Sequence, residues 1–207
     1  MRYLKITTCL LFASLFPVLT FQVAAQSSDA SGFSVKVREV AFASMRPAGA
    51  GDSWLETTVE LDVRGDGTLE GANSRYVDRV KVALSLGIQS RLTENGFRFF
   101  RSEAEAVTLK NGKAQFRFYL PPEVVERDRV RGRASAYMVQ IYVDGKLLPL
   151  ASENVSGMLR TGKALQSFKD HIARDAIRNE GILVSQFDSP FLFDYRGSTP
   201  SFVRKQR

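Results

Sequence analysis

The strongest constraint on the fold of this chain is a strict alternation of apolar and polar residues. In residues 54–63, every second side chain from Leu55 to Val63 is apolar or threonine, and those between are acidic or threonine. Neighbouring side chains of a strand point to opposite faces, so this repeat predicts a strand with one buried face. Similar stripes occupy residues 33–45, 80–88, 114–120 and 135–143, with an interrupted strand expected over 97–109 and a short one over 147–150.

Short polar pairs separate these strands. Asn95-Gly96, Asn111-Gly112 and Asp144-Gly145 readily adopt positive φ at the centre of tight hairpins. Within residues 33–45 the apolar positions shift by one, which predicts a bulge near Glu39. Regular short strands joined by such hairpins indicate a two-sheet antiparallel sandwich.

Two consecutive prolines mark a corner. Proline lacks the N–H that a central strand needs, so Pro121 and Pro122 end the strand before them. Proline also suits the first turn of a helix, and Glu123 and Glu126 lie favourably near its N-terminus. We expect a short helical turn over residues 122–128 that carries the chain into the opposite sheet.

The stretch from Ala114 to Lys146 resembles the E strand, E–F corner and F strand of an immunoglobulin-like domain. In that fold a tyrosine stands two residues before the cysteine of strand F and hydrogen-bonds back to the corner. Tyr137 and Val139 match these two positions, with valine in place of cysteine, while the only tryptophan, Trp54, falls on the second strand instead of the third. The resemblance implies an all-β, immunoglobulin-like antiparallel β-sandwich over residues 33–157 that has no disulfide.

The N-terminus resembles an export signal. Residues 1–25 begin with Arg2 and Lys5, continue through an apolar run and end in small residues, which is the order of a secretory signal peptide. They contain the only cysteine, Cys9, and a polar lead-in over residues 26–32 follows. We therefore expect an exported, thiol-free protein of the periplasm, outer membrane or cell surface.

A helix and a tail are expected after the sandwich. Apolar residues from Ala164 to Ala176 recur at intervals of three and four, which predicts a helix within residues 158–181, capped by Thr161 and ended by Gly181. Residues 182–207 contain two prolines and are expected to be an extended, irregular tail.

Charge indicates the class of partner. The leader holds two basic residues and no acid, so the net charge of +7 becomes +5 without it. A mildly basic exported chain favours anionic envelope material or an acidic protein over nucleic acid. Four arginines at alternate positions are the candidate polyanion site, because guanidinium groups along one face suit phosphate, sulfate or carboxylate: Arg127, Arg129, Arg131 and Arg133.

Each candidate binding feature has a simpler alternative. The arginine row could be a solvated corner balanced by Glu123, Glu126 and Asp128. Five aromatic rings in the tail cannot all stay in water without forming an apolar patch, so they either cover this domain or dock onto a partner or a second copy. These candidate partner-binding residues are Phe187, Phe191, Phe193, Tyr195 and Phe202.

Catalytic chemistry has little support in the sequence. His171 is the only histidine, and it falls within the predicted helix between Asp170 and Asp175 without a nucleophile motif. One histidine and no cysteine in the mature chain do not supply the ligands of a zinc site. We expect a non-enzymatic protein that needs no cofactor and no metal.

The order of signal peptide, cysteine-free sandwich, helix and tail is similar to the layout of immunoglobulin-like envelope proteins associated with type IV pilus-like loci in verrucomicrobial bacteria. This resemblance implies a structural or interaction role in an envelope or pilus-like assembly, with docking through the C-terminal helix and tail. The alternative is a module that binds an anionic glycan or lipid headgroup through the arginine row.

Overall fold

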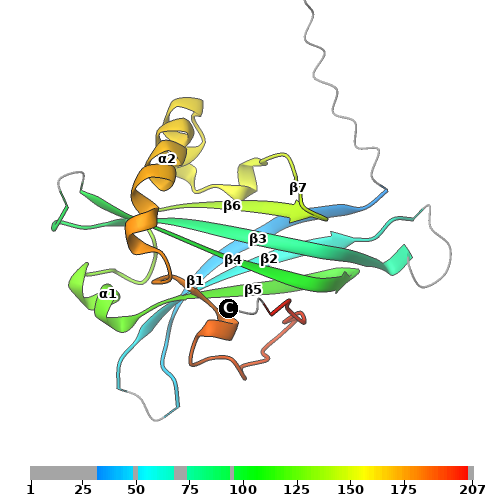
Figure 1. Ribbon diagram of the computed structural model, residues 1–207, viewed down its shortest axis with the longest axis horizontal. Helices are drawn as coiled ribbons and strands as arrows, with labels where there is room; N and C mark the ends of the chain where they lie inside the picture. The colour runs from blue at the N-terminus through cyan, green and yellow to red at the C-terminus, as the bar shows by residue number, and fades with distance from the viewer. Residues whose placement is uncertain (1–31, 49–50, 68–73, 94–95, 205–207) are drawn as a thin grey trace, which may run out of the picture.

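Two antiparallel sheets pack face to face in the computed structural model, which describes residues 32–48, 51–67, 74–93 and 96–204 (Figure 1). The predicted signal peptide and nearly all of the lead-in lie outside these residues. Sheet A has the order β1 (Ser34–Met45), β2 (Trp54–Arg64), β5 (Gly112–Leu120) and β8 (Val184–Ser185). Sheet B has the order β4 (Phe97–Lys110), β3 (Tyr76–Gln89), β6 (Ala136–Val143) and β7 (Lys146–Leu147).

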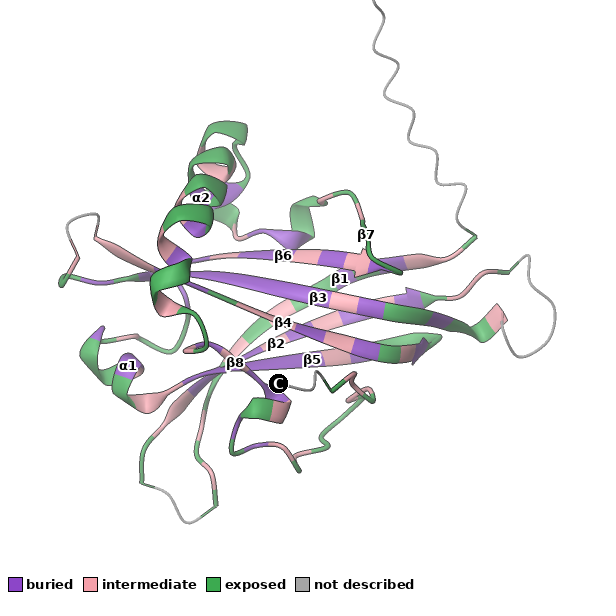
Figure 2. Ribbon diagram, viewed as in Figure 1, coloured by how far each residue is buried: buried purple, intermediate pink, exposed green. Residues whose placement is uncertain are grey.

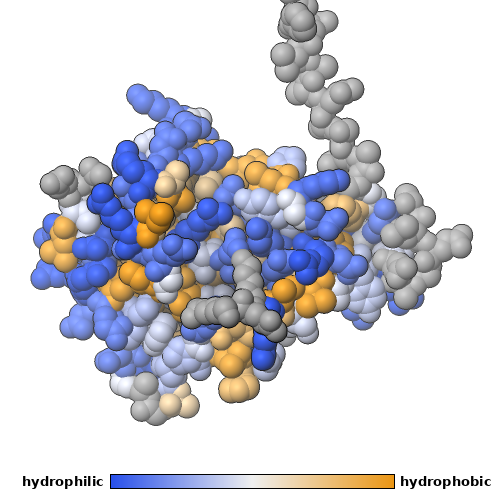
Figure 3. Space-filling view, viewed as in Figure 1, coloured by the Kyte–Doolittle hydropathy of each residue, from blue (hydrophilic) through white to orange (hydrophobic). Residues whose placement is uncertain are grey.

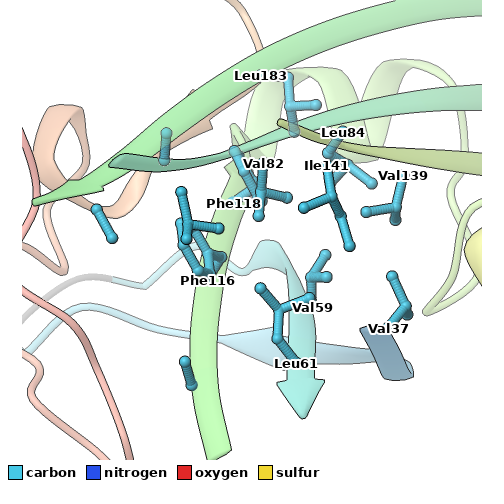
Figure 4. Packing of buried hydrophobic residues seen from close by; sticks show 14 of the residues in the cluster. Val37, Val59, Leu61, Val82, Leu84, Phe116, Phe118, Val139, Ile141 and Leu183 are labelled. Carbon is cyan, nitrogen blue, oxygen red and sulfur yellow. The ribbon is translucent and has the colours of Figure 1, made fainter. Parts of the chain in front are cut away.

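The core lies between the two sheets, where the predicted apolar stripes meet. Figure 4 shows Val59, Leu61 and Phe116 from sheet A facing Leu84 and Ile141 from sheet B. All five are at most 3% exposed. Burying each such side chain contributes about 1.5–3 kcal/mol, so the sheets are held together by this apolar contact.

Several local predictions agree with the structure. The pairing of β1 with β2 slips between Val37 and Glu39, which is the predicted bulge. Asp144 and Gly145 both have positive φ, at 47° and 77°, as a tight hairpin requires. After β5 ends at Leu120, helix α1 (Pro122–Arg127) crosses the end of the sandwich and β6 continues in the other sheet.

Two strand predictions need correction. The expected interruption over residues 97–109 is wrong, because β4 is continuous. Its pattern is irregular since Phe100 faces the core while Phe99 packs under a helix on the other face. The short strand expected over residues 147–150 is limited to Lys146–Leu147, because Pro149 has no N–H for the ladder.

A single longer helix covers the outer face of sheet B. Helix α2 (Gly162–Asp175) turns its buried residues toward the sheet (Figure 2), and Thr161 caps its N-terminus by accepting a hydrogen bond from the Ala164 N–H at 3.3 Å. Phe168 and Ile172 pack on apolar residues of β4 and β6. Two short 3₁₀ turns contact the helix, η3 (Gly157–Leu159) and η4 (Ala176–Asn179). Two others lie elsewhere: η2 (Ser152–Asn154) against β1 and β6, and η5 (Gln186–Asp188) against β5 and β8.

Gly87 permits this close packing in the middle of β3. A Cβ at this position would lie 3.1 Å from Cε2 of Phe168, tighter than ordinary contact.

We predict that Gly87→Val destabilises the fold by about 1–3 kcal/mol through overpacking, and that Phe168→Ala costs about 3–5 kcal/mol. In the double variant, the valine should cost much less than it does alone, because the clashing ring is gone. Urea unfolding of the four proteins measures this coupling; additive losses would contradict the packing argument.

Candidate functional site

The loop after α1 places the four predicted arginines beside one groove. Arg127 ends the helix, and Arg129 and Gly132 both have positive φ, at 52° and 69°. The loop is therefore irregular, not the extended row in which the side chains would share one face of a strand. All four arginines nevertheless line the same groove of about 990 Å³.

Three other segments complete this arginine groove. They are β1 at Val40 and Phe42, the β3–β4 hairpin at Arg91 and Leu92, and the chain around η3. In Figure 3, hydrophobic patches lie among hydrophilic residues at the end of the molecule where Figure 1 draws α1. The lining residues are Val40, Phe42, Ile88, Gln89, Arg91, Leu92, Arg127, Asp128, Arg129, Val130, Arg131, Arg133, Ala134, Ser135, Tyr137, Ser156, Gly157 and Met158.

Apolar side chains also line the arginine groove. The rings of Phe42 and Tyr137 lie 6.0 Å apart between β1 and β6, while Leu92 and Met158 are 62% and 55% exposed at the edge. Burial raises the pKa of Tyr137, and the charge of Arg160 partly opposes that shift, so the phenol is neutral at pH 7. In the described part of the chain, the Tyr137 hydroxyl makes no hydrogen bond back to the corner, which differs from the immunoglobulin-like pattern.

A buried carboxylate fixes the loop that carries the arginines. Asp128 accepts hydrogen bonds from the Ser90 hydroxyl and from Arg127, each at 2.8 Å. Arg98 Nε lies 3.2 Å from Asp128 Oδ1 but lacks hydrogen-bond geometry, so its contribution is one of charge. Burial alone would raise the pKa of Asp128, yet the hydrogen bonds from Arg127 and Ser90 and the two positive charges hold it below its usual value.

The remaining charge of the arginine groove is positive. Asp128 is the only acid among its described lining residues. Arg91, Arg129, Arg131 and Arg133 are exposed, and they have no ion pair with a described acidic residue. Guanidinium groups form bidentate bonds with phosphate, sulfate and carboxylate. The site can thus hold an anion that also carries apolar groups.

We predict that Asp128→Asn destabilises the protein by about 1–3 kcal/mol at pH 7, because charge-assisted hydrogen bonds in a buried site are lost. The pKa of Asp128 is depressed on folding, so its stabilisation is present above the unfolded pKa of about 3.9 and is lost as pH falls through the folded value. The free energies of unfolding of the variant and the parent, measured in urea, should converge at low pH. If the two free energies of unfolding differ by the same amount from pH 7 down to pH 2, or do not differ at pH 7, the Asp128 carboxylate does not stabilise the loop. Asp52→Asn, in an exposed turn, is the matched control.

The structure divides the five aromatic rings of the tail into two groups. Phe191 stacks on Tyr119 at 4.4 Å and meets Trp54 edge-on at 6.0 Å. Phe202 packs against Phe187 at 4.6 Å and against Phe116 of the core at 5.2 Å. Three of the predicted partner-binding rings thus cover this domain. Partner binding stays a prediction, and the two exposed rings available for it are Phe193 at 83% and Tyr195 at 62%.

The tail also joins the edges of the two sheets. The Ser198 carbonyl accepts a hydrogen bond from the Gln115 N–H of β5 at 2.8 Å. Farther along, the Ser201 carbonyl accepts from the Val107 N–H of β4, and Phe202 forms a bridge with Ala106. The segment between residues 198 and 203 therefore links sheet A to sheet B through backbone bonds.

A buried polar network holds the tail on the outer face of sheet A. Glu56 is 4% exposed and accepts hydrogen bonds from the Tyr119 hydroxyl at 2.8 Å and from Arg196 at 2.6 Å. Arg117, also 4% exposed, donates to Thr199 at 2.6 Å and to the Arg196 carbonyl. Burial, followed by the hydrogen bond and charge of Glu56, raises the pKa of Tyr119 well above its usual value.

Removing the Arg196 side chain would leave Glu56 without its cationic partner. We predict that Arg196→Ala lowers the free energy of unfolding by about 1–3 kcal/mol and loosens the tail. Because Trp54 contacts Phe191, its fluorescence reports the tail directly. In the variant, Trp54 fluorescence should change at a lower urea concentration than in the parent. The control Arg178→Ala, at an exposed position, should leave the free energy of unfolding and the fluorescence change as they are in the parent. A stable Arg196→Ala protein with unaltered fluorescence would show that the tail does not depend on this ion pair.

The histidine cluster has a structural explanation. His171 stacks on Phe99 at 5.0 Å, and its Nδ1 lies 2.9 Å from Asp175 Oδ2. Hydrogen bonds from Arg174 and His171 lower the pKa of Asp175 to about 2. Within the described residues, no three acidic, histidine or cysteine side chains group in a way that could hold a metal. None of the helices described has the length and apolar character needed to cross a membrane.

Comparison with known proteins shows a relationship of fold. No protein-family model matches the chain, and no curated protein matches its sequence. A crystal structure of a protein from Akkermansia muciniphila is similar, with a TM-score of 0.65 and 14% sequence identity. The match covers 84% of this chain and 94% of that chain. At this identity, the likeness establishes a shared fold over most of both proteins.

Proposed function

We propose that this chain is a non-enzymatic, exported structural or interaction protein of a bacterial envelope or pilus-like assembly. Its sandwich is the rigid scaffold, and the arginine groove is its principal docking site. The partner is an anionic surface that also offers apolar groups.

The strand order supports an immunoglobulin-like assignment for the scaffold. The neighbours β1, β2 and β5 correspond to strands A, B and E of that fold, and β3, β6 and β7 correspond to C, F and G. The place of strand D beside E is taken by β8, which comes from the tail. Helix α1 then occupies the E–F corner, at the end of the sandwich opposite to the B–C and F–G loops.

The observation that carries the proposal is that arginines and apolar side chains from separate segments line one groove. Arg91, Arg129, Arg131 and Arg133 come from two separate segments, yet they surround one groove that contains Phe42. Apolar contact and charge-assisted hydrogen bonds act together at such a site. The loop that carries the arginines is also fixed, because the buried Asp128 is bound by Ser90 and Arg127 and lies beside Arg98. A corner whose arginines only contact solvent does not require this anchor.

The assignment to an envelope assembly rests on the layout of the chain. Akkermansia muciniphila, the source of the similar structure, is a verrucomicrobial bacterium, the same group as in the resemblance of layout. The N-terminal residues have the order of a secretory signal. Together these points favour the periplasm, the outer membrane or the cell surface.

Heparin chromatography tests the anion-binding proposal. We predict that the mature protein is retained on heparin and that Arg129→Ala/Arg131→Ala/Arg133→Ala lowers the eluting salt concentration by about 0.1–0.2 M, since contacts with a polyanion are screened by salt. The control replaces three exposed basic residues on the other side of sheet B: Lys163, Lys169 and Arg178.

The control variant loses the same charge but leaves the arginine groove intact. It should elute close to the parent. Equal losses in the two triple variants would mean that heparin senses net charge alone, and this result would contradict a specific site in the groove.

A further inference from the structure

The exposed part of the tail forms a second surface, which we term the aromatic tip and define as Leu192, Phe193, Asp194 and Tyr195. Phe193 and Tyr195 are among the most exposed large hydrophobic side chains in the described residues. In Figure 3 a hydrophobic patch marks the lower side, where Figure 1 draws this part of the tail. The other three rings of the tail pack on this domain, whereas these two form an exposed apolar surface that is available for contact.

The aromatic tip is held in place at both ends. Phe191 is stacked on Tyr119 on one side, and Arg196 is bound to Glu56 on the other. Between these anchors, the buried Gln186 side-chain amide donates to the carbonyls of Phe191 at 3.2 Å and Asp194 at 2.6 Å. The tip therefore presents its rings in a preorganised conformation, which lowers the entropic cost of binding.

The aromatic tip does not fill the arginine groove of its own chain. No residue of the tip lines the groove. Four residues lie between Phe191 and Arg196, and a residue spans at most about 3.6 Å, so the tip stays near the outer face of sheet A while both anchors hold. Only another molecule can bring a tip to this groove.

The two surfaces are chemically complementary. The tip offers the exposed rings of Phe193 and Tyr195, while the Asp194 carboxylate between them is already paired with Arg196 at 2.6 Å. The groove offers apolar side chains, such as Phe42 and Met158, and four arginines without a described acidic partner. Guanidinium groups stack on aromatic faces, so the arginines of the groove can receive the two rings.

We propose that the aromatic tip of one copy docks into the arginine groove of the next. This inference rests on the proposed function of the groove and names a second copy of the chain as its partner. Because the two surfaces differ, the contact is head-to-tail and repeats from copy to copy, which produces a ring or an open filament. Such growth suits a component of an extended assembly.

Two variants separate the halves of this contact. The tip variant, Phe193→Ser/Tyr195→Ser, keeps its groove, and the groove variant, Arg129→Glu/Arg131→Glu/Arg133→Glu, keeps its tip. Light scattering after size exclusion should show the parent associating as its concentration approaches about 0.1 mM, the range of a small transient contact. Each variant alone should remain monomeric.

Mixing the two variants in equal amounts gives the decisive result. An intact tip from the groove variant can occupy the intact groove of the tip variant, and no working surface then remains. The mixture should form a dimer and grow no further. Controls are Ile177→Ser, which removes another highly exposed apolar residue, and Lys163→Glu/Arg178→Glu, both of which should associate as the parent does.

The outcomes distinguish this inference from the function on which it rests. A parent that stays monomeric to about 1 mM, variants that still associate, or a monomeric mixture of folded variants overturns the head-to-tail contact. If heparin retention still depends on the groove in that case, the anionic docking function stands and its partner is a different molecule. If the copies do not associate and heparin retention does not depend on the groove, the groove is not a docking site.

Discussion

The packing of two apolar sheet faces is the interaction on which this protein depends. The chain has a single cysteine, so no disulfide within it joins the sheets. Apolar side chains from both layers, such as Phe116 and Leu84, are completely buried instead. The tail adds a second connection, since Phe202 rests on Phe116 while its neighbours bond to both edge strands.

The same scaffold positions the two candidate binding surfaces. The corner helix must cross from one sheet to the other, and the loop that completes this crossing carries the arginines. Asp128 binds this loop to Ser90 on the neighbouring hairpin. On another face, Glu56 and Arg196 hold the tail so that its remaining rings are presented to solvent. Both surfaces thus derive their geometry from buried charges at the margin of the core.

The sequence predicts local features well, and the contacts between distant segments poorly. Alternation locates the strands, and its one-residue shift locates the bulge at Val37 and Glu39, because both signals are contained in adjacent residues. The arginine groove joins Phe42, Arg91 and Met158, whose proximity depends on how the sheets pack. Glu56 has the position of an exposed strand residue, yet the tail covers it, and nothing local to the strand indicates this.

A preformed site for anionic, partly apolar partners in the arginine groove can be located by NMR chemical-shift mapping with a short heparin oligosaccharide. We expect the backbone amides that shift to be confined to three segments that meet at the groove: residues 89–92, 127–135 and 156–158. Shifts spread over the basic face of α2, or over basic residues throughout the surface, would contradict it.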